Sequence, residues 1–158
     1  MPEVIIANSS AIIALQRRGQ LATSLKGKTV FITRRIYEEL VDKPLKVLSR
    51  IKLPELRDKI KRSVSEIISL IERGTIRIPE MDFRSVSKVM DEARLRIAKI
   101  EGISPDKVKA DHTVIGLAIY FARKGHTVIF LSNDKAINSV VEYFSKREKL
   151  KIKVRTIP

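Results

Sequence analysis

The sequence predicts an α/β fold in which a mainly parallel sheet carries helices on both faces. Short apolar runs rich in β-branched residues alternate with longer segments whose apolar residues recur at helical spacing. Each connection between successive apolar runs is long enough to hold a helix, and crossovers of that kind join parallel strands. The first and fourth runs are continuously apolar, as expected for strands buried on both faces.

The first half of the chain is expected to hold three strands and three helices. The strands are predicted at 4–7, 29–32 and 75–78, and the helices at 11–18, from 34 onward, and at 54–73. Ser9 or Ser10 is expected to cap the first helix and Thr33 the second, because their hydroxyl oxygens can accept from the free N–H groups of a first turn. Pro44 should end or interrupt the second helix, since it lacks an N–H group.

The second half is expected to add three helices and two strands. The helices are predicted at 83–100, 111–123 and 135–145, and the strands at 127–131 and, by alternation, at 152–156. Gly102 and Gly125 are expected to stop the helices before them. Because no repeat or linker interrupts the 158 residues, they are predicted to form a single domain, 1–158.

The charge of the chain points to a partner that carries phosphates. Lys and Arg number 32 against 18 Asp and Glu, a net charge of +14, which favours nucleic acid. The basic excess concentrates in residues 43–73, with nine basic against four acidic residues, and in residues 146–155, with six against one. A hyperthermophile surface would also be highly charged, but it does not explain the one-sided sign.

The composition narrows the chemistry to oxygen ligands. There is no cysteine, so disulfides, thiolate nucleophiles and cysteine-zinc sites are excluded. His112 and His126 are the two imidazoles, and no Ser stands in a recognisable nucleophile turn. Neither a membrane-spanning run nor a signal peptide is recognisable, so a cytoplasmic location is expected.

Polar residues stand where predicted strands end, at the edge where α/β proteins form ligand sites. Asn8 follows the first strand, Asp134 follows the strand at 127–131, and Asp111 opens a helix on its apolar face. Capping or the helix dipole would explain each aspartate taken singly. Glu38 and Glu39 flank the apolar side of their helix at similar angles, so the helical repeat does not choose between them.

These segments resemble the PIN-domain ribonucleases over most of the chain. The resemblance lies in four segments in the family's order: the strand and hydroxyl residues at 4–10, the Glu-Leu pair at 36–40, the Asp before an Ala-rich helix at 111–118, and the strand ending in Ser-Asn-Asp at 128–134. The second segment selects Glu39. The resemblance implies a three-layer α/β/α sandwich with a central, mainly parallel sheet of four to five strands.

The resemblance also implies an endoribonuclease that uses Mg²⁺ or Mn²⁺ to generate a hydroxide for in-line attack on RNA. On this interpretation Glu39, Asp111 and Asp134 bind the metal directly or through water, with Asn8 at the fourth position, and Ser132 orients a carboxylate or a water. The family also implies a homodimer. The stretch from Gly102 to Asp111, together with Glu39 and Asp42, resembles archaeal enzymes that trim small-subunit ribosomal RNA, whereas the short length resembles toxins that pair with an antitoxin.

The sequence departs from the family at Asn8, where the family has aspartate. Asparagine still offers a carbonyl oxygen but removes one negative charge from the metal site. The residue is an inactivating substitution introduced for study, a mark of a degenerate nuclease, or a tolerated variant. Two functions follow: a metal-dependent endoribonuclease with weakened activity, or a noncatalytic RNA-binding or ribosome-assembly module. A response-regulator or phosphatase-like domain would need an aspartate nucleophile at this position.

Overall fold

Five parallel strands form the central sheet of this protein, whose computed structural model describes residues 3–158. The strands are β1 (Glu3–Ala7), β2 (Val30–Phe31), β3 (Ile76–Arg77), β4 (Thr127–Leu131) and β5 (Ile152–Arg155). Their order across the sheet is β3-β2-β1-β4-β5, and each neighbouring pair is parallel. The predicted mainly parallel sheet is confirmed, with β1 at its centre.

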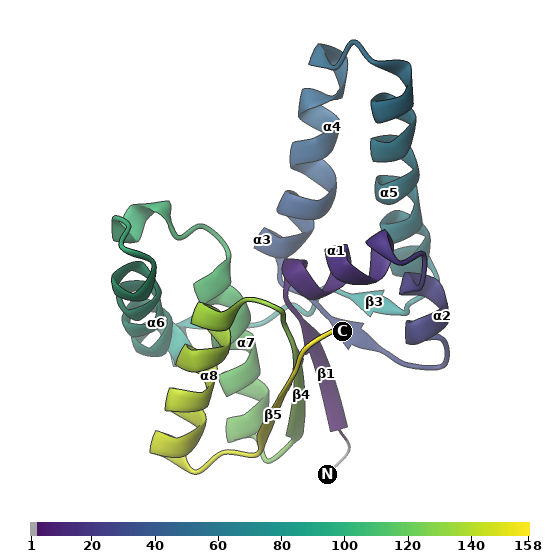
Figure 1. The fold of residues 1–158 in the computed structure, drawn as a ribbon. Coiled ribbons are helices and arrows are strands. Elements are labelled where there is room, and N and C mark those ends of the chain that lie inside the picture. Colours follow the sequence, from purple (N-terminus) through teal and green to yellow (C-terminus); the bar gives the residue numbers. More distant parts are fainter. Residues whose placement is uncertain (1–2) are drawn as a thin grey trace.

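Helices cover both faces of the sheet. They are α1 (Ser9–Arg17), α2 (Leu21–Leu25), α3 (Arg34–Tyr37), α4 (Lys43–Val47), α5 (Pro54–Glu72), α6 (Ser87–Glu101), α7 (Asp111–Arg123) and α8 (Lys135–Glu148). In Figure 1, α6, α7 and α8 lie on one side of the sheet, and α1 and α2 lie on the other. This arrangement confirms the three-layer sandwich.

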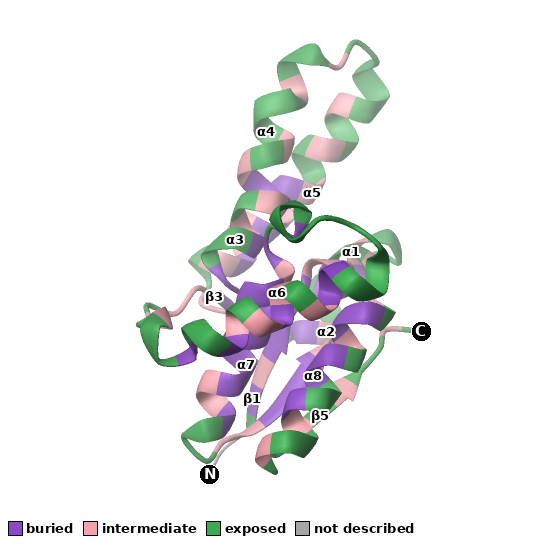
Figure 2. Ribbon diagram, turned by 90° about the vertical axis from the view of Figure 1, so that its left-hand side faces the viewer, coloured by how far each residue is buried: buried purple, intermediate pink, exposed green. Residues whose placement is uncertain are grey.

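Helix α7 lies at the centre of the hydrophobic core. Every residue from His112 to Ile119 is buried, because α7 contacts β1 and β4 on one side and α6 and α8 on the other (Figure 2). At Gly116 the packing is so close that an added Cβ would lie 2.6 Å from Cγ of Met90 in α6. A helix held on all sides in this way fixes the position of the residue at its start, Asp111.

Helices α4 and α5 form a helical arm, residues 43–72, that projects beyond the sheet (Figure 1). The part of the arm farthest from the sheet is largely exposed (Figure 2). Its core contacts lie near the base, where α5 buries Val64, Ile67 and Leu70. No helix in residues 3–158 is long and apolar enough to cross a membrane.

Two details of the first helices differ from the prediction. Helix α1 begins at Ser9, and the residue before it, Asn8, is the N-cap, so the prediction that Ser9 or Ser10 caps the helix is wrong. The physical reason is that β1 leads directly into the helix, and the Asn8 carbonyl already accepts from the N–H groups of Ala11 at 3.2 Å and Ile12 at 3.4 Å. The short helix α2 was not predicted.

Pro44 interrupts the regular helix without ending it. After α3 the chain forms a π-helical turn at Glu38–Asp42, continues as α4 and closes with a 3-10 turn at Leu48–Arg50. Because Pro44 cannot donate to a carbonyl in the preceding turn, a widened turn before it is a physically reasonable solution. The predicted helix at 83–100 begins as a 3-10 turn at Phe83–Val86 and continues as α6. Strands β2 and β3 have two residues each instead of four.

A hydroxyl pair joins α3 to α7. Thr33 caps α3 as predicted, since its Oγ1 accepts from the N–H of Ile36 at 3.3 Å. The Oγ1 atoms of Thr33 and Thr113 lie 2.9 Å apart, and Thr113 Oγ1 donates to the Ala110 carbonyl at 2.5 Å. The Thr113 proton is thereby used, so Thr33 is the donor of the pair. This buried contact links α3, which leads into the turn that carries Glu39, with α7, which begins at Asp111.

Replacing Thr33 with valine is expected to lower the free energy of unfolding by about 2 kcal/mol, because both the helix cap and the buried hydrogen bond are lost at constant volume. Denaturant unfolding measures the change. The matched control is Thr156→Val, since Thr156 is exposed and lies beyond β5. A loss of equal size in both variants would contradict the structural role of the Thr33–Thr113 pair.

Candidate functional site

Two polar residues are buried side by side where the central strands end. Strands β1 and β4 pair along their whole length, from Glu3 beside Thr127 to Ala7 beside Leu131. The ladder continues one step further, because the N–H of Asn8 donates to the Leu131 carbonyl at 2.9 Å. Asn8 is 1% exposed and Ser132 is 0% exposed. The carboxyl ends of β1 and β4 therefore meet at one edge, as predicted for a parallel sheet.

Ser132 organises the turn that carries Asp134. Its Oγ accepts from the Asp134 N–H at 3.1 Å, and Asp134 Oδ1 accepts from the Ile137 N–H at 3.1 Å as the N-cap of α8. The same turn is tied to α1 by a bond from the Asn133 N–H to Ser10 Oγ at 2.9 Å. The capping bond thus uses Oδ1 of Asp134, and Oδ2 takes no part in it.

Glu39 lies in the π-helical turn and is half-buried, whereas its neighbour Glu38 is exposed. Burial raises the pKa of the Glu39 carboxyl, while a hydrogen bond from Ser9 and the charge of Lys43 oppose that rise. The contact between Glu39 and Ser9 joins the π-helical turn to the start of α1. Sequence reasoning assigned Ser9 to a helix cap and missed this role. Lys43 was detectable, because it stands four residues after Glu39 on a helix.

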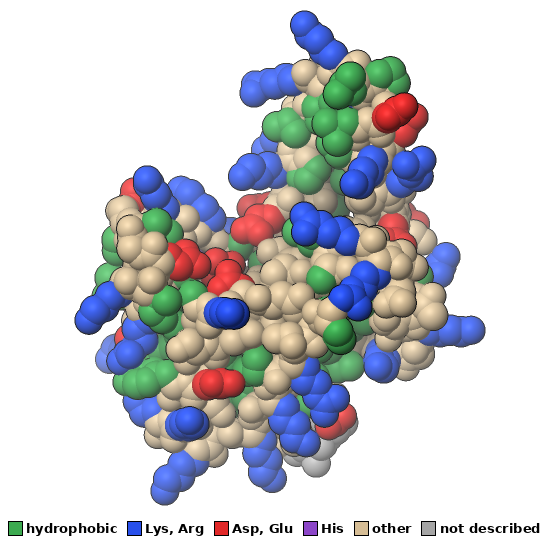
Figure 3. Space-filling model, viewed as in Figure 1, with side chains coloured by type: hydrophobic (Ala, Val, Ile, Leu, Met, Phe, Trp, Pro, Cys, Tyr) green, Lys and Arg blue, Asp and Glu red, His purple; other side chains and the backbone are tan. Residues whose placement is uncertain are grey.

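Asp111, the first residue of α7, has a strongly raised pKa. Burial raises its pKa from 3.8 to about 7, and repulsion from Glu39, Asp134 and Glu101 adds to that rise. Glu39 and Asp134, which stand far apart in the sequence, are thus close enough to act on Asp111. In Figure 3 acidic side chains gather where the base of the arm meets the body of the protein. Carboxylates that repel one another form a natural cation site.

Asn8 adds an oxygen without a partner. Its Oδ1 is buried and has no hydrogen-bond partner, and a buried acceptor left unpaired is unfavourable by about 1–3 kcal/mol. A water or a cation beside it would remove that penalty. Asn8 and the acids near it supply only oxygen, the ligand type that Mg²⁺ and Mn²⁺ prefer.

The geometry limits how a metal could be held. Within residues 3–158, no three acidic or histidine side chains are grouped closely enough to hold one ion directly. A site in which Glu39, Asp111 and Asp134 all bind a metal directly is therefore not formed. The residues fit a hydrated ion instead, since Mg²⁺ usually keeps several waters and takes one or two carboxylates. At least one of the three acids would then act through water.

A cleft of about 530 Å³ opens beside Glu39. The residues that line it come from α3, the π-helical turn, α4 and the loop before α7, and they are Arg35, Glu38, Glu39, Asp42, Lys43, Lys46, Lys109 and Ala110. Acids and bases thus share one opening. Lys109 carries no local sequence signal that would have indicated this position.

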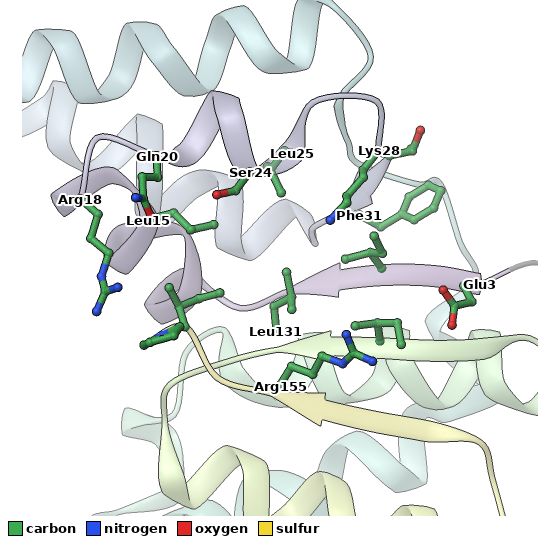
Figure 4. A pocket seen from close by; sticks show the side chains of 15 residues that line it. Glu3, Leu15, Arg18, Gln20, Ser24, Leu25, Lys28, Phe31, Leu131 and Arg155 are labelled. Carbon is green, nitrogen blue, oxygen red and sulfur yellow. The ribbon is translucent and has the colours of Figure 1, made fainter.

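A larger cavity lies elsewhere. It measures about 750 Å³ and runs along the sheet under α1 and α2 (Figure 4). Among the described residues that line it, the one acid is Glu3, against Arg18, Lys28 and Arg155. None of the five predicted site residues lines it. Of the five predicted site residues, Glu39 lines the smaller cleft, and Asp111 directly follows its lining residue Ala110 in the chain. The smaller cleft is therefore the better candidate site despite its volume.

The raised pKa of Asp111 predicts a stability that depends on pH. The folded protein holds a proton on Asp111 up to about pH 7, whereas the unfolded chain releases it near pH 3.8. The free energy of unfolding should therefore fall as pH rises between these values, by about 2 kcal/mol after allowance for solvent screening. The Asp111→Asn variant should lose most of this fall and be more stable than the parent protein at about pH 8.

Urea unfolding at about pH 5 and about pH 8 tests this in the absence of divalent ions. Asp58→Asn serves as the control, because Asp58 is exposed on α5. If Asp111→Asn retains the full fall, Asp111 does not carry the raised pKa.

Comparison with known proteins identifies the family of the chain. The family described as Halobacterial PIN domain matches residues 2–157. A solved structure, that of PAE2754 from Pyrobaculum aerophilum, is similar at 15% identity, with a TM-score of 0.44, covering 93% of this chain and 97% of that one. No curated protein matched the sequence. Since the family match spans nearly the whole chain, the protein belongs to the PIN-domain family.

Proposed function

We propose that this PIN domain is a metal-dependent endoribonuclease whose activity is weakened by Asn8. Family membership indicates a nuclease-like or RNA-related module. The observation that supports hydrolysis most directly is the environment of Asp111, whose pKa is raised to about 7 by burial and, in addition, by repulsion from Glu39, Asp134 and Glu101. A half-buried acid with other acids near it, and with no salt bridge to Glu39, Asp111 or Asp134 in residues 3–158, is suited to hold a cation.

The proposed roles follow from position. A divalent cation held at the site would supply an activated water and neutralise charge on the phosphate. Asp111 is the proposed main ligand, because it is the most strongly affected acid and the rigid start of α7 fixes it. Glu39, held by Ser9, and Asp134, held by its capping bond, would take a ligand or a bound water. Ser132 is proposed to orient Asp134, because the Ser132 Oγ accepts from the Asp134 N–H group.

A second candidate function is a noncatalytic RNA-binding module, including a role in ribosome assembly. The observation that favours it is Asn8, whose buried amide replaces the carboxylate of the family pattern. The net charge of +14 would support binding to RNA without cleavage. The two functions share a binding surface and differ in whether phosphodiester bonds are broken.

Restoring the carboxylate is expected to raise activity. Asn8→Asp should increase Mg²⁺-dependent cleavage of single-stranded RNA by at least about tenfold, the scale on which supporting groups change metal sites. The double variant Asn8→Asp, Asp111→Asn should lose that gain. Cleavage of a labelled RNA with Mg²⁺, Mn²⁺ or a chelator measures the effect. If neither the parent protein nor Asn8→Asp cleaves RNA although both bind it, the noncatalytic function is correct.

Metal binding can be measured without activity. At about pH 8, Mg²⁺ at roughly a hundredfold above its dissociation constant should raise the free energy of unfolding by about 2.7 kcal/mol. Asn8→Asp should reach the same gain at a lower Mg²⁺ concentration, and Asp111→Asn should show little gain. Asp58→Asn again provides the control, and an Mg²⁺ effect that survives Asp111→Asn would place the ion elsewhere.

A further inference from the structure

The cleft beside Glu39 has positive charges on both of its walls. One wall is formed by α3 and α4, which contribute Arg35, Lys43 and Lys46, and the other by the loop before α7, which contributes Lys109. All four side chains are exposed. Three acids, Glu38, Glu39 and Asp42, line the same cleft. Asp111 stands two residues after Lys109 in the chain. Among the described residues that line the cleft, the four cations therefore outnumber the acids by one, and they lie beside Glu39.

The four cations of the cleft are accessible to a ligand, although the charge of Lys43 also acts on Glu39. Within residues 3–158, salt bridges are formed by Arg84, Arg96, Arg123 and Arg147, and none is formed by the four cations of the cleft. Lys43 and Lys46 are three residues apart on α4, so they lie on the same side of the helix. The one hydrogen bond from this group runs from Arg35 Nη1 to the Lys109 carbonyl at 3.5 Å and spans the cleft.

The second basic segment predicted from the sequence lies away from the cleft. In residues 146–155, Arg147 bonds Glu92 at 2.8 Å, and Arg155 lines the cavity of about 750 Å³, which contains no predicted site residue. No residue of 146–155 lines the cleft beside Glu39, whereas Lys43 and Lys46 of the first segment do. Of the two basic segments, the one that includes α4 is therefore next to Glu39.

An RNA phosphate that approaches Glu39 and Asp111 is repelled by them, so cations nearby are required to hold it. We infer that Arg35, Lys43, Lys46 and Lys109 form a phosphate-binding subsite for a single RNA strand that reaches Glu39 between α4 and the loop before α7. The volume of about 530 Å³ is that of a small-ligand pocket. It suits a short single-stranded segment and excludes a duplex. This inference rests on the proposed function.

The test compares two variants of equal charge. Lys43→Gln with Lys46→Gln removes two cations from the cleft, and Lys52→Gln with Lys61→Gln removes two exposed cations from the same arm outside it. The probes are a short labelled single-stranded RNA and the duplex made with its complement. Fluorescence anisotropy at several salt concentrations, without divalent ions, gives the affinity and its salt dependence.

The cleft variant should bind the single strand about tenfold or more weakly than the parent protein, with a salt slope smaller by about 0.7 for each phosphate that is no longer neutralised. The arm control should change much less, and the parent protein should prefer the single strand to the duplex. Equal losses in the two variants, or a preference for the duplex, would overturn the inference while leaving RNA cleavage intact. Absence of RNA binding by the parent protein would instead refute the proposed function.

Discussion

The parallel pairing of β1 with β4 is the constraint on which the rest of the site depends. The two strands run in register over their full length, so the chain leaves both at one edge. Asn8 and Ser132 are consequently buried together, and the turn after Ser132 brings in Asp134. Helix α7 adds Asp111, and the π-helical turn after α3 adds Glu39. The Thr33–Thr113 contact fixes α3 relative to α7. The site is therefore assembled from segments that only the sheet brings together.

The elements predicted most accurately are those with the strongest burial. Strand β4 and helix α7 have the predicted bounds, because a continuous apolar run leaves few alternatives. The prediction was least accurate where tertiary contacts decide the structure. Helix α2 is too short to show a periodic pattern, and its formation depends on burying Leu21 and Leu25. The π-helical turn before Pro44 likewise depends on local hydrogen bonding that hydrophobic spacing does not report.

The candidate site was predictable in its members but not in its detailed geometry. Strand ends pointed to Asn8 and Asp134, and the family pattern chose Glu39 where the helical repeat could not. The structure agrees with that choice to the extent that Glu39 is half-buried and Glu38 is exposed. The sequence left open whether these acids bind a metal directly or through water, and within residues 3–158 no three of them are close enough to hold an ion directly. Side-chain distances of this kind are set by packing, which the sequence pattern does not specify.

Asn8 can be understood as a compromise between stability and metal affinity. Burial, with added repulsion from Glu39, Asp134 and Glu101, already shifts Asp111 toward the neutral form. An aspartate at position 8 would add a further negative charge to this buried edge and raise the pKa of Asp111 still more. The metal-free fold would then be less stable, whereas a bound cation would gain affinity. Asparagine keeps a buried oxygen, Oδ1, at this position and avoids the charge.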